Sequence, residues 1–431
     1  MRPASQLAVQ PCDTPARIIE KAAHIVPTAA QLAWQQREVT AFTHFGMNTF
    51  TGREWGSGTE DPKRFALPRI DVDQWMRAYK AAGAEQVMLT AKHHDGFVLY
   101  PSRYTPHAVR ASPGKPDVVG AYVRAARKAG LKVGLYLSPS DGAELPHARH
   151  ARWVEEVRRK QAEGKPLSLP ERVALEDRGR APAGLGRFGN GSAVTERALP
   201  TLVPGDDRAA AVRDGRLPSF TVRADDYGAY YLNQVYELLT QYGPVEELWL
   251  DGANPWADAG VTQKYDVRQW FGTIRRLSPR TVVFQGPQGV RWVGNEKSVG
   301  RNASLLLNVP PGCDGRIAAA DVASLAAFGR AVRDTYGRNV LERAPGARPG
   351  GVTFDRVGLG EDLRSGQRVE RFAVEARTGG AWRRIAEGTT VGHRRILVLP
   401  APVTADAVRV RVLAARATPR LRPVTAHLSR P

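Results

Sequence analysis

The stretch Glu247-Leu248-Trp249-Leu250-Asp251-Gly252 is a short apolar run that ends on a carboxylate. Such a continuous run is typical of a strand that is buried on both faces, as in a parallel sheet. Similar runs recur along the chain, with helical patterns between them. They cover residues 39–45, 86–93, 132–138, 246–251, 281–285, 291–295 and 304–309. This alternation of strand and helix indicates parallel βαβ units.

The helical patterns and the strand ends indicate how these units are arranged. Amphipathic segments lie at residues 71–82, 117–129, 226–241 and 265–277. Three of them are followed directly by a C-cap glycine, at Gly83, Gly130 and Gly243. Several strands end in polar residues, namely His44, His93, His94, Asp251 and Glu296. Because (β/α)8 barrels carry their active sites at the carboxyl ends of the strands, this pattern predicts a TIM-like barrel.

The strand count is one short of a full barrel. Between the strand that ends near residue 295 and the one that begins near residue 304, there are too few residues for a crossover helix, which needs about a dozen. The expected fold class is therefore α/β, a (β/α)8 TIM-like barrel that is missing or irregular in one strand.

The chain divides into a barrel and a smaller C-terminal unit. We expect the barrel over residues 1–343, with an inserted subdomain or lid at residues 142–224 that includes a charged helix at 149–161. A helix at residues 321–336 leads to a Pro/Gly-rich linker at 344–351. Residues 352–431 are predicted to form a small antiparallel β-sandwich, with strands at 369–375, 381–386, 394–399 and 407–413.

The composition is that of a globular protein. Of the 431 residues, 42% are hydrophobic and 24% are charged, which excludes the disordered and fibrous classes. No apolar run is long enough for a bilayer span, so no membrane partner is expected. Residues 1–36 lack the pattern of a signal peptide, which predicts a cytoplasmic protein; a longer N-terminus with a signal would make it secreted. Only Cys12 and Cys313 are present, which excludes a disulfide framework and a Cys-based metal cluster.

The formal net charge of +19 raises the alternative of a nucleic-acid-binding protein, whose DNA affinity would depend steeply on salt. The arginines are scattered through helices and C-terminal strands, and no stripe of basic residues is interleaved with aromatic ones. We therefore expect no nucleic-acid partner. The sequence leaves the oligomeric state open.

Two strand-end carboxylates could carry chemistry. Asp251 follows a buried strand and could act as a nucleophile, although an Asp here could equally cap a helix or hold a turn. Glu296 also follows a predicted strand, and its alternative is a surface turn residue. Retaining glycosidases place two carboxyl groups about 5 Å apart, one as nucleophile and one as acid/base. Two nearby barrel strands could supply that pair.

A third cluster consists of His, Glu and Trp residues. Thr90-Ala91-Lys92-His93-His94-Asp95-Gly96-Phe97 is joined by Thr43-His44-Phe45-Gly46 and Arg53-Glu54-Trp55. Such residues suit a neutral sugar, because His and Glu bind hydroxyls and an aromatic ring covers an apolar face. Zinc is the alternative for the two adjacent histidines. It is disfavoured because consecutive strand residues point to opposite faces, unless the strand has already ended, and no third ligand lies at metal-site spacing.

The ordered set of motifs resembles the α-L-fucosidases of glycoside hydrolase family 29. The resemblance runs from about residue 26 to residue 336 and rests on His44-Phe45-Gly46, Arg53-Glu54-Trp55, Lys92 to Phe97, Leu135-Tyr136-Leu137-Ser138, Leu248-Trp249-Leu250-Asp251-Gly252 and Asn308-Val309-Pro310-Pro311. It implies a retaining exo-glycosidase that removes terminal α-L-fucose from fucosylated glycans by double displacement, without metal or organic cofactor.

The resemblance also implies roles for single residues. Asp251 matches the family's nucleophile, and the segment at residues 290–296 is similar to the subfamily that prefers α-1,3/1,4-linked fucose, with Glu296 as its acid/base. The C-terminal strands resemble a galactose-binding-like β-sandwich, shortened at its start. The residues implied in fucose binding are His44, Glu54, Trp55, His93, His94, Tyr136 and Trp249.

One departure from the family pattern keeps an alternative open. The family has several dozen residues between the positions that match Glu296 and Ser298, and here they are absent, at the same place where the strand count is short. The alternative is a catalytically impaired relative that binds fucose without turnover.

Overall fold

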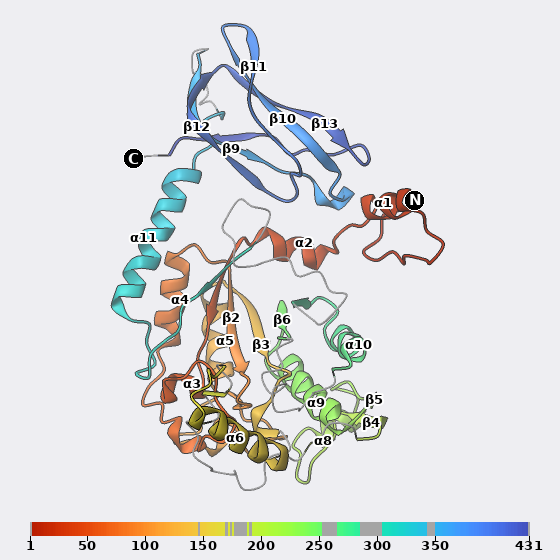
Figure 1. Cartoon of the computed structure of the whole chain (residues 1–431), viewed down its shortest axis with the longest axis vertical. Helices are drawn as coiled ribbons and strands as arrows, with labels where there is room; N and C mark the ends of the chain where they lie inside the picture. The colour runs from red at the N-terminus through yellow and green to blue at the C-terminus, as the bar shows by residue number, and fades with distance from the viewer. Residues whose placement is uncertain are drawn as a thin grey trace.

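The centre of the fold is a parallel sheet. The computed structural model describes residues 2–144, 147–168, 171–172, 175, 188, 192–251, 265–284, 304–342 and 350–429. Six strands, all parallel, form the sheet in the order β7-β6-β3-β2-β1-β8 (Figure 1). They are β1 (Val39–Thr43), β2 (Gln86–Lys92), β3 (Lys132–Leu137), β6 (Glu247–Trp249), β7 (Val282–Phe284) and β8 (Leu305–Asn308).

The sheet is strongly curled. Strands β1 and β6 are three places apart in the sheet order, so they would lie about 14 Å apart if the sheet were flat. Nevertheless, the ring centroids of Phe42 in β1 and Trp249 in β6 are only 5.0 Å apart. The two rings therefore meet inside a half-barrel. This confirms the predicted α/β fold class, while the strand expected at residues 291–295 lies outside the described residues.

Helices cover the outer face of the sheet. The first turns of α4, α5 and α10 are capped by Asp71, Asp117 and Asp266, whose side chains accept a backbone N–H three residues on. Gly83, Gly130 and Gly243 all have positive φ, as expected for C-cap glycines. No helix within the described ranges is both long and apolar enough to cross a membrane. The main helices are α4 (Val72–Ala81), α5 (Val118–Lys128), α9 (Asp226–Gln241) and α10 (Val267–Leu277).

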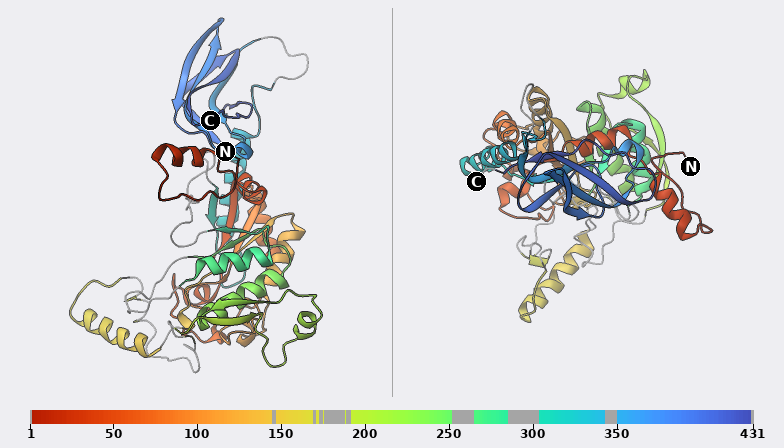
Figure 2. Two further views of the ribbon diagram at one scale, coloured as in Figure 1. Left: turned by 90° about the vertical axis from the view of Figure 1, so that its right-hand side faces the viewer. Right: turned by 90° about the horizontal axis from the view of Figure 1, so that it is seen from above.

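The segment predicted as an insertion lies at the carboxyl end of the sheet. Figure 1 shows its helix α6 (His147–Ala162) at the same end as α3 (Met47–Thr51), which follows β1 directly. Figure 2 shows that α6 projects from the body of the molecule. The insertion also contains η3 (Gly142–Glu144), the antiparallel pair β4 (Thr195–Leu199) and β5 (Phe220–Ala224), and α8 (Ala209–Arg213).

Two N-terminal helices are absent from the sequence-based prediction. They are α1 (Pro15–Ala23) and α2 (Ala29–Gln36). Their start signals are present, because Thr14 caps α1 and Thr28 forms a capping box with Gln31 at the start of α2. α2 packs against the amino end of the sheet, where the Trp34 indole N–H donates to Glu247 Oε2 at 2.5 Å. Short 3-10 turns lie at η1 (Pro62–Arg64), η2 (Val109–Ala111) and η5 (Leu363–Ser365).

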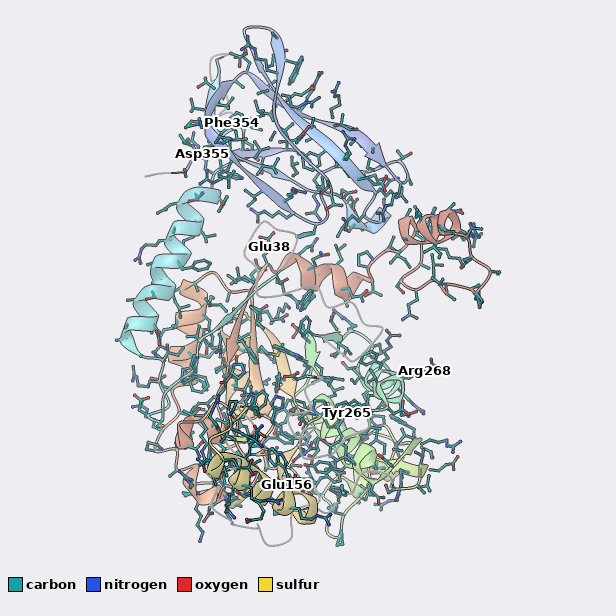
Figure 3. The ribbon with its side chains drawn as sticks, viewed as in Figure 1. Glu38, Glu156, Tyr265, Arg268, Phe354 and Asp355 are labelled. Atoms are coloured by element: carbon teal, nitrogen blue, oxygen red, sulfur yellow. The ribbon has the colours of Figure 1, made fainter. Side chains whose placement is uncertain are left out.

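The C-terminal residues form two three-stranded antiparallel sheets with a core of their own. The sheet orders are β11-β10-β13 and β12-β9-β14, and the core between them includes Phe354 and Phe372. The sheets lie at the amino end of the parallel strands, on the side of Glu38 (Figure 3). Arg394 donates to Glu38 Oε2 at 2.6 Å. The prediction of a galactose-binding-like module stays a prediction. The strands are β9 (Val352–Leu359), β10 (Val369–Thr378), β11 (Ala381–Gly388), β12 (Arg395–Ala405), β13 (Ala407–Ala415) and β14 (Thr425–His427).

A glycine sets the closest approach between α11 (Ala319–Tyr336) and α4. A Cβ atom on Gly329 would lie 1.9 Å from the backbone oxygen of Ala81, at the end of α4. We expect Gly329→Ala to lower the free energy of unfolding by about 1–3 kcal/mol, although alanine favours helix, because the backbone of α4 would have to move. Urea unfolding followed by circular dichroism measures this change.

The matched control is Gly272, in the middle of α10. A Cβ atom there would have no neighbour within 4 Å, and the residue is exposed. Gly272→Ala should therefore raise the free energy of unfolding by up to about 1 kcal/mol. If both substitutions raised the free energy of unfolding, the close contact between α11 and α4 at Gly329 would be contradicted.

Candidate active site

Alternation along the parallel strands places the predicted site inside the half-barrel. Phe42, Tyr136 and Trp249 face one another across the inner side of the sheet, with ring centroids 5.0 to 5.8 Å apart. Side chains two residues apart on a strand share a face. His44 follows β1 directly, and its ring centroid lies 4.1 Å from that of Phe42. Asp251 follows β6 by two residues and accepts a hydrogen bond from Tyr136. Both therefore lie beside the aromatic layer at the carboxyl end of the sheet. The aromatic layer therefore forms the floor beneath them.

Asp251 is held at this end by the Tyr136 hydroxyl and lies next to His94. The Tyr136 hydroxyl donates to Asp251 Oδ2 at 2.8 Å, and His94 Nε2 lies 3.6 Å from the same oxygen. The Asp251 side chain is 24% exposed, which leaves it accessible to a ligand. Burial and the nearby charge of Asp251 raise the pKa of Tyr136 well above its usual value. Tyr136 is therefore a permanent hydrogen-bond donor to this carboxylate.

Three histidines form the wall beside Asp251. Burial lowers the pKa of His44 and, more strongly, that of His93. Burial also lowers the pKa of His94, against the opposing effect of the Asp251 charge. All three imidazoles are therefore neutral near pH 7. A neutral imidazole has one donor and one acceptor nitrogen, which suits sugar hydroxyls.

The two adjacent histidines lie together, and the alternation argument that separated them does not apply. Strand β2 ends at Lys92, after a register shift between Thr90 and Lys92, so His93 and His94 follow the strand. Their ring centroids are 4.5 Å apart. Within the described part of the chain, no group of three or more His, Cys, Asp or Glu side chains could hold a metal ion.

Glu54 and Trp55 reach the site from the loop after α3. The Trp55 ring meets His94 edge-on, at a centroid distance of 5.5 Å and an interplanar angle of 85°. Glu54 is exposed and lines a cleft of about 510 Å³. His44, Trp55, His93 and Asn308 line the same cleft. A cleft of this size with polar and aromatic walls fits a monosaccharide unit and its neighbour.

Two polar residues that the sequence reasoning missed fix this loop. The buried Glu60 accepts backbone N–H groups of Ser57 at 2.7 Å and Gly58 at 2.9 Å. The Asn48 amide donates to the Glu54 carbonyl oxygen at 3.0 Å and contacts His93 Nδ1 at 3.3 Å. Asn48 therefore couples the loop to the histidine wall. Both residues lie close in sequence to predicted site residues, but their contacts depend on the loop's path.

A buried ion pair lies next to the histidines. Lys92 Nζ is 2.8 Å from Asp141 Oδ2, and both side chains are fully buried. The Tyr230 hydroxyl donates to the same oxygen at 2.9 Å, and the Lys92 ammonium lies over the rings of Tyr230 and Tyr231 at 5.2 and 5.3 Å. Lys92 belongs to one of the motifs found in the sequence, but its partner was not predicted, because Asp141 comes from the loop after β3.

The structure thus brings most of the predicted residues together. His93, His94, Tyr136 and Asp251 are in contact, and the others surround them, namely His44, Glu54, Trp55 and Trp249. Glu296 lies outside the described residues, so its distance from Asp251 is not part of this geometry.

Comparison with known proteins identifies the family of the chain. The model of the alpha-L-fucosidase family matches residues 22–288, which is more than half of the chain. The chain belongs to the α-L-fucosidase family. Alpha-L-fucosidase 1 of Arabidopsis thaliana is 28% identical, over 91% of this chain and 86% of its own. A rice (Oryza sativa) protein named "Putative alpha-L-fucosidase 1" is 30% identical, over 91% of this chain and 83% of its own.

A solved structure extends the similarity to three dimensions. A Bacteroides ovatus protein assigned to the α-L-fucosidases superposes with a TM-score of 0.73 and 30% identity, over 97% of this chain and 77% of its own. As a member of the α-L-fucosidase family, the chain has the fold and the ancestry of fucose-hydrolysing glycosidases. The alternative of an impaired fucose-binding relative is not favoured by these similarities.

Proposed function

We propose that this protein is a retaining exo-α-L-fucosidase in which Asp251 is the nucleophile. The observation that carries the proposal is the position of Asp251. It lies at the carboxyl end of β6, partly accessible, with a fixed donor on one oxygen and neutral histidines around it. Family membership supplies the substrate class, terminal α-linked L-fucose on a glycan.

The reaction proceeds in two displacements. Asp251 attacks the anomeric carbon and forms a covalent ester, while the bond to the leaving oxygen breaks and that oxygen takes a proton from an acid. In the second step a water attacks the same carbon, gives its proton to the conjugate base, and releases Asp251 as a carboxylate. We assign the acid/base role to Glu296, on the resemblance of its segment alone. The Tyr136 hydroxyl donates to Oδ2 of Asp251 and orients the carboxylate.

Removal of the Tyr136 hydroxyl tests this assignment. Tyr136→Phe should lower kcat/KM on an aryl α-L-fucoside by about ten- to a hundredfold, because a hydrogen bond to a charged group is worth roughly 1.5–3 kcal/mol. Steady-state kinetics with both variant and wild type measure the ratio.

The matched control is Tyr122→Phe. The Tyr122 hydroxyl is also buried and bonds Thr43 Oγ1 at 2.9 Å, but it lies away from Asp251. This control should lose stability and keep its kcat/KM. Equal losses of kcat/KM in the two variants would remove Tyr136 from the mechanism.

We further propose a preference for α-1,3/1,4-linked fucose on branched glycans, which rests on the resemblance of residues 290–296. To test the linkage preference, α-1,3/1,4- and α-1,2-fucosylated oligosaccharides are hydrolysed in parallel, and the release of free fucose is measured. Faster release from the α-1,2-linked substrates would contradict the linkage preference. Release from none of them, with no hydrolysis of an aryl fucoside, would contradict the function itself.

A further inference from the structure

The two adjacent histidines each have one ring nitrogen occupied by the protein. In His93 and in His94 that nitrogen is Nδ1, and its partners are Asn48 and Ser138 respectively. His94 is buried and His93 is half-buried, and loss of hydration is the main cause that lowers the pKa of each, so both imidazoles are neutral near pH 7. A neutral imidazole carries its single proton on one nitrogen, and the partner of the other nitrogen decides which one.

Asn48 decides the tautomer of His93. The Asn48 side-chain nitrogen is 3.0 Å from the Glu54 carbonyl oxygen, and a carbonyl oxygen can only accept, so this side of the amide is the NH₂ group. The same nitrogen is 3.3 Å from His93 Nδ1. The amide therefore donates to Nδ1, and the His93 proton is on Nε2. Because His93 lines the cleft, Nε2–H is the group left to meet a ligand.

Ser138 decides the tautomer of His94 in the opposite sense. The Ser138 hydroxyl has one hydrogen, which it donates to the Ser140 carbonyl oxygen at 2.7 Å. Its contact with His94 Nδ1, also 2.7 Å, must then be one in which Nδ1–H donates to the hydroxyl oxygen. The Nε2 atom of His94 carries the lone pair. It faces the site, 3.6 Å from Asp251 Oδ2.

We propose that Asn48 and Ser138 hold His93 and His94 in opposite tautomers, so that the site meets its sugar with one imidazole donor beside one imidazole acceptor. The tautomers follow from these contacts in rings that burial keeps neutral, while the identity of the ligand rests on the proposed function. A sugar hydroxyl both donates and accepts, so this pair matches hydroxyl groups. A fluorine or an ether oxygen only accepts, so it leaves the His94 lone pair without a donor. Asn48 and Ser138 are positioning residues that set specificity.

The decisive measurement is NMR of the imidazole nitrogens in the whole, unliganded protein labelled with ¹⁵N-histidine. The shifts of Nδ1 and Nε2 distinguish the two neutral tautomers from each other and from the charged ring. His93→Gln and His94→Gln assign the signals. Near pH 7 we expect the proton on Nε2 in His93 and on Nδ1 in His94. The same tautomer in both, or a charged ring in either, would overturn the proposal.

Substitutions at Asn48 and Ser138 test whether these residues set the tautomers of His93 and His94. Asn48→Asp replaces the donor by an acceptor, so His93 should take its proton on Nδ1 or become charged, while His94 keeps its state. Ser138→Thr retains the hydroxyl and should keep the wild-type tautomer of His94, whereas Ser138→Ala should release it. An unchanged His93 in Asn48→Asp would show that Asn48 does not set the tautomer.

A kinetic measurement connects the tautomers to the substrate. Asn48→Asp should lower kcat/KM on an aryl α-L-fucoside by at least about tenfold, mainly through KM, because a buried hydroxyl contact is lost. Deoxyfluoro analogues should be poorer substrates than the parent fucoside for the wild type. The two claims fail separately. An inactive protein with opposite tautomers would contradict the proposed function only, and an active protein with matching tautomers would contradict this inference only.

Discussion

Asp251→Ala should lower kcat/KM on an aryl α-L-fucoside by about 10⁴-fold or more, because the nucleophile of a double displacement has no substitute within the site. The carboxylate sits at the end of β6 with Tyr136 bonded to Oδ2, so the variant loses both the attacking oxygen and the acceptor of that bond. Alanine leaves space next to the anomeric carbon. Added azide should enter this space and restore part of the activity, with a glycosyl azide as the product.

A control on the same strand separates chemistry from folding. Glu246 lies at the amino end of β6, where its Oε2 accepts the backbone N–H of Val133 at 2.9 Å. Glu246→Gln should leave kcat/KM within about twofold of the wild type, since it lies at the opposite end of the strand from the site. Full activity of Asp251→Ala would assign the nucleophile elsewhere. If Asp251→Ala and Glu246→Gln were both folded and inactive, the loss of kcat/KM in Asp251→Ala would not be specific to the nucleophile.

Lys92→Met should lower the free energy of unfolding by about 3–5 kcal/mol, the largest stability effect that we expect from a single substitution near the site. The substitution leaves Asp141 as a buried charge without its cation, and this costs far more than the loss of an exposed pair. Methionine is about as long as lysine, so little volume is lost. Chemical denaturation with urea measures the change, at a pH near 7.

Two comparisons show whether the effect comes from the unpaired charge. The double variant Lys92→Met/Asp141→Asn removes both charges and should recover a large part of the loss. The exposed pair of Lys128 and Asp73, 3.4 Å apart, offers a matched substitution, and Lys128→Met should change stability by less than about 1 kcal/mol. If Lys92→Met and Lys128→Met lowered the free energy of unfolding by a similar, small amount, a strongly stabilising buried pair would be contradicted.

The sequence predicted the elements of the fold whose signals are local. The helices expected at residues 71–82, 117–129 and 265–277 are present and begin at the caps Asp71, Asp117 and Asp266, and the glycines expected after helices have positive φ, because a cap needs only neighbours along the chain. The helices α1 and α2 were missed even though Thr14 and Thr28 cap them. These helices lie outside the βαβ pattern, and the contact of Trp34 with Glu247 that anchors α2 spans most of the barrel sequence.

For the site, the sequence predicted side chains that the structure brings together, but not the residues that hold them. The strand-end pattern predicted that His44 and Asp251 lie at the carboxyl end of the sheet, where the structure has them, while the alternation argument failed for His93 and His94 because β2 ends before them. The roles of Asn48 and Asp141 depend on loops whose paths no local pattern specifies. The assignment of Glu296 stays a prediction.

The most direct test of the central claim is the stereochemistry of the first product. Proton NMR during hydrolysis of an aryl α-L-fucoside by the wild-type protein resolves the anomer of fucose that appears before mutarotation. A retaining fucosidase with Asp251 as nucleophile releases α-L-fucose first. Initial release of the β-anomer would contradict the double displacement, and an unchanged spectrum under conditions in which the protein is folded would contradict the assignment as a fucosidase.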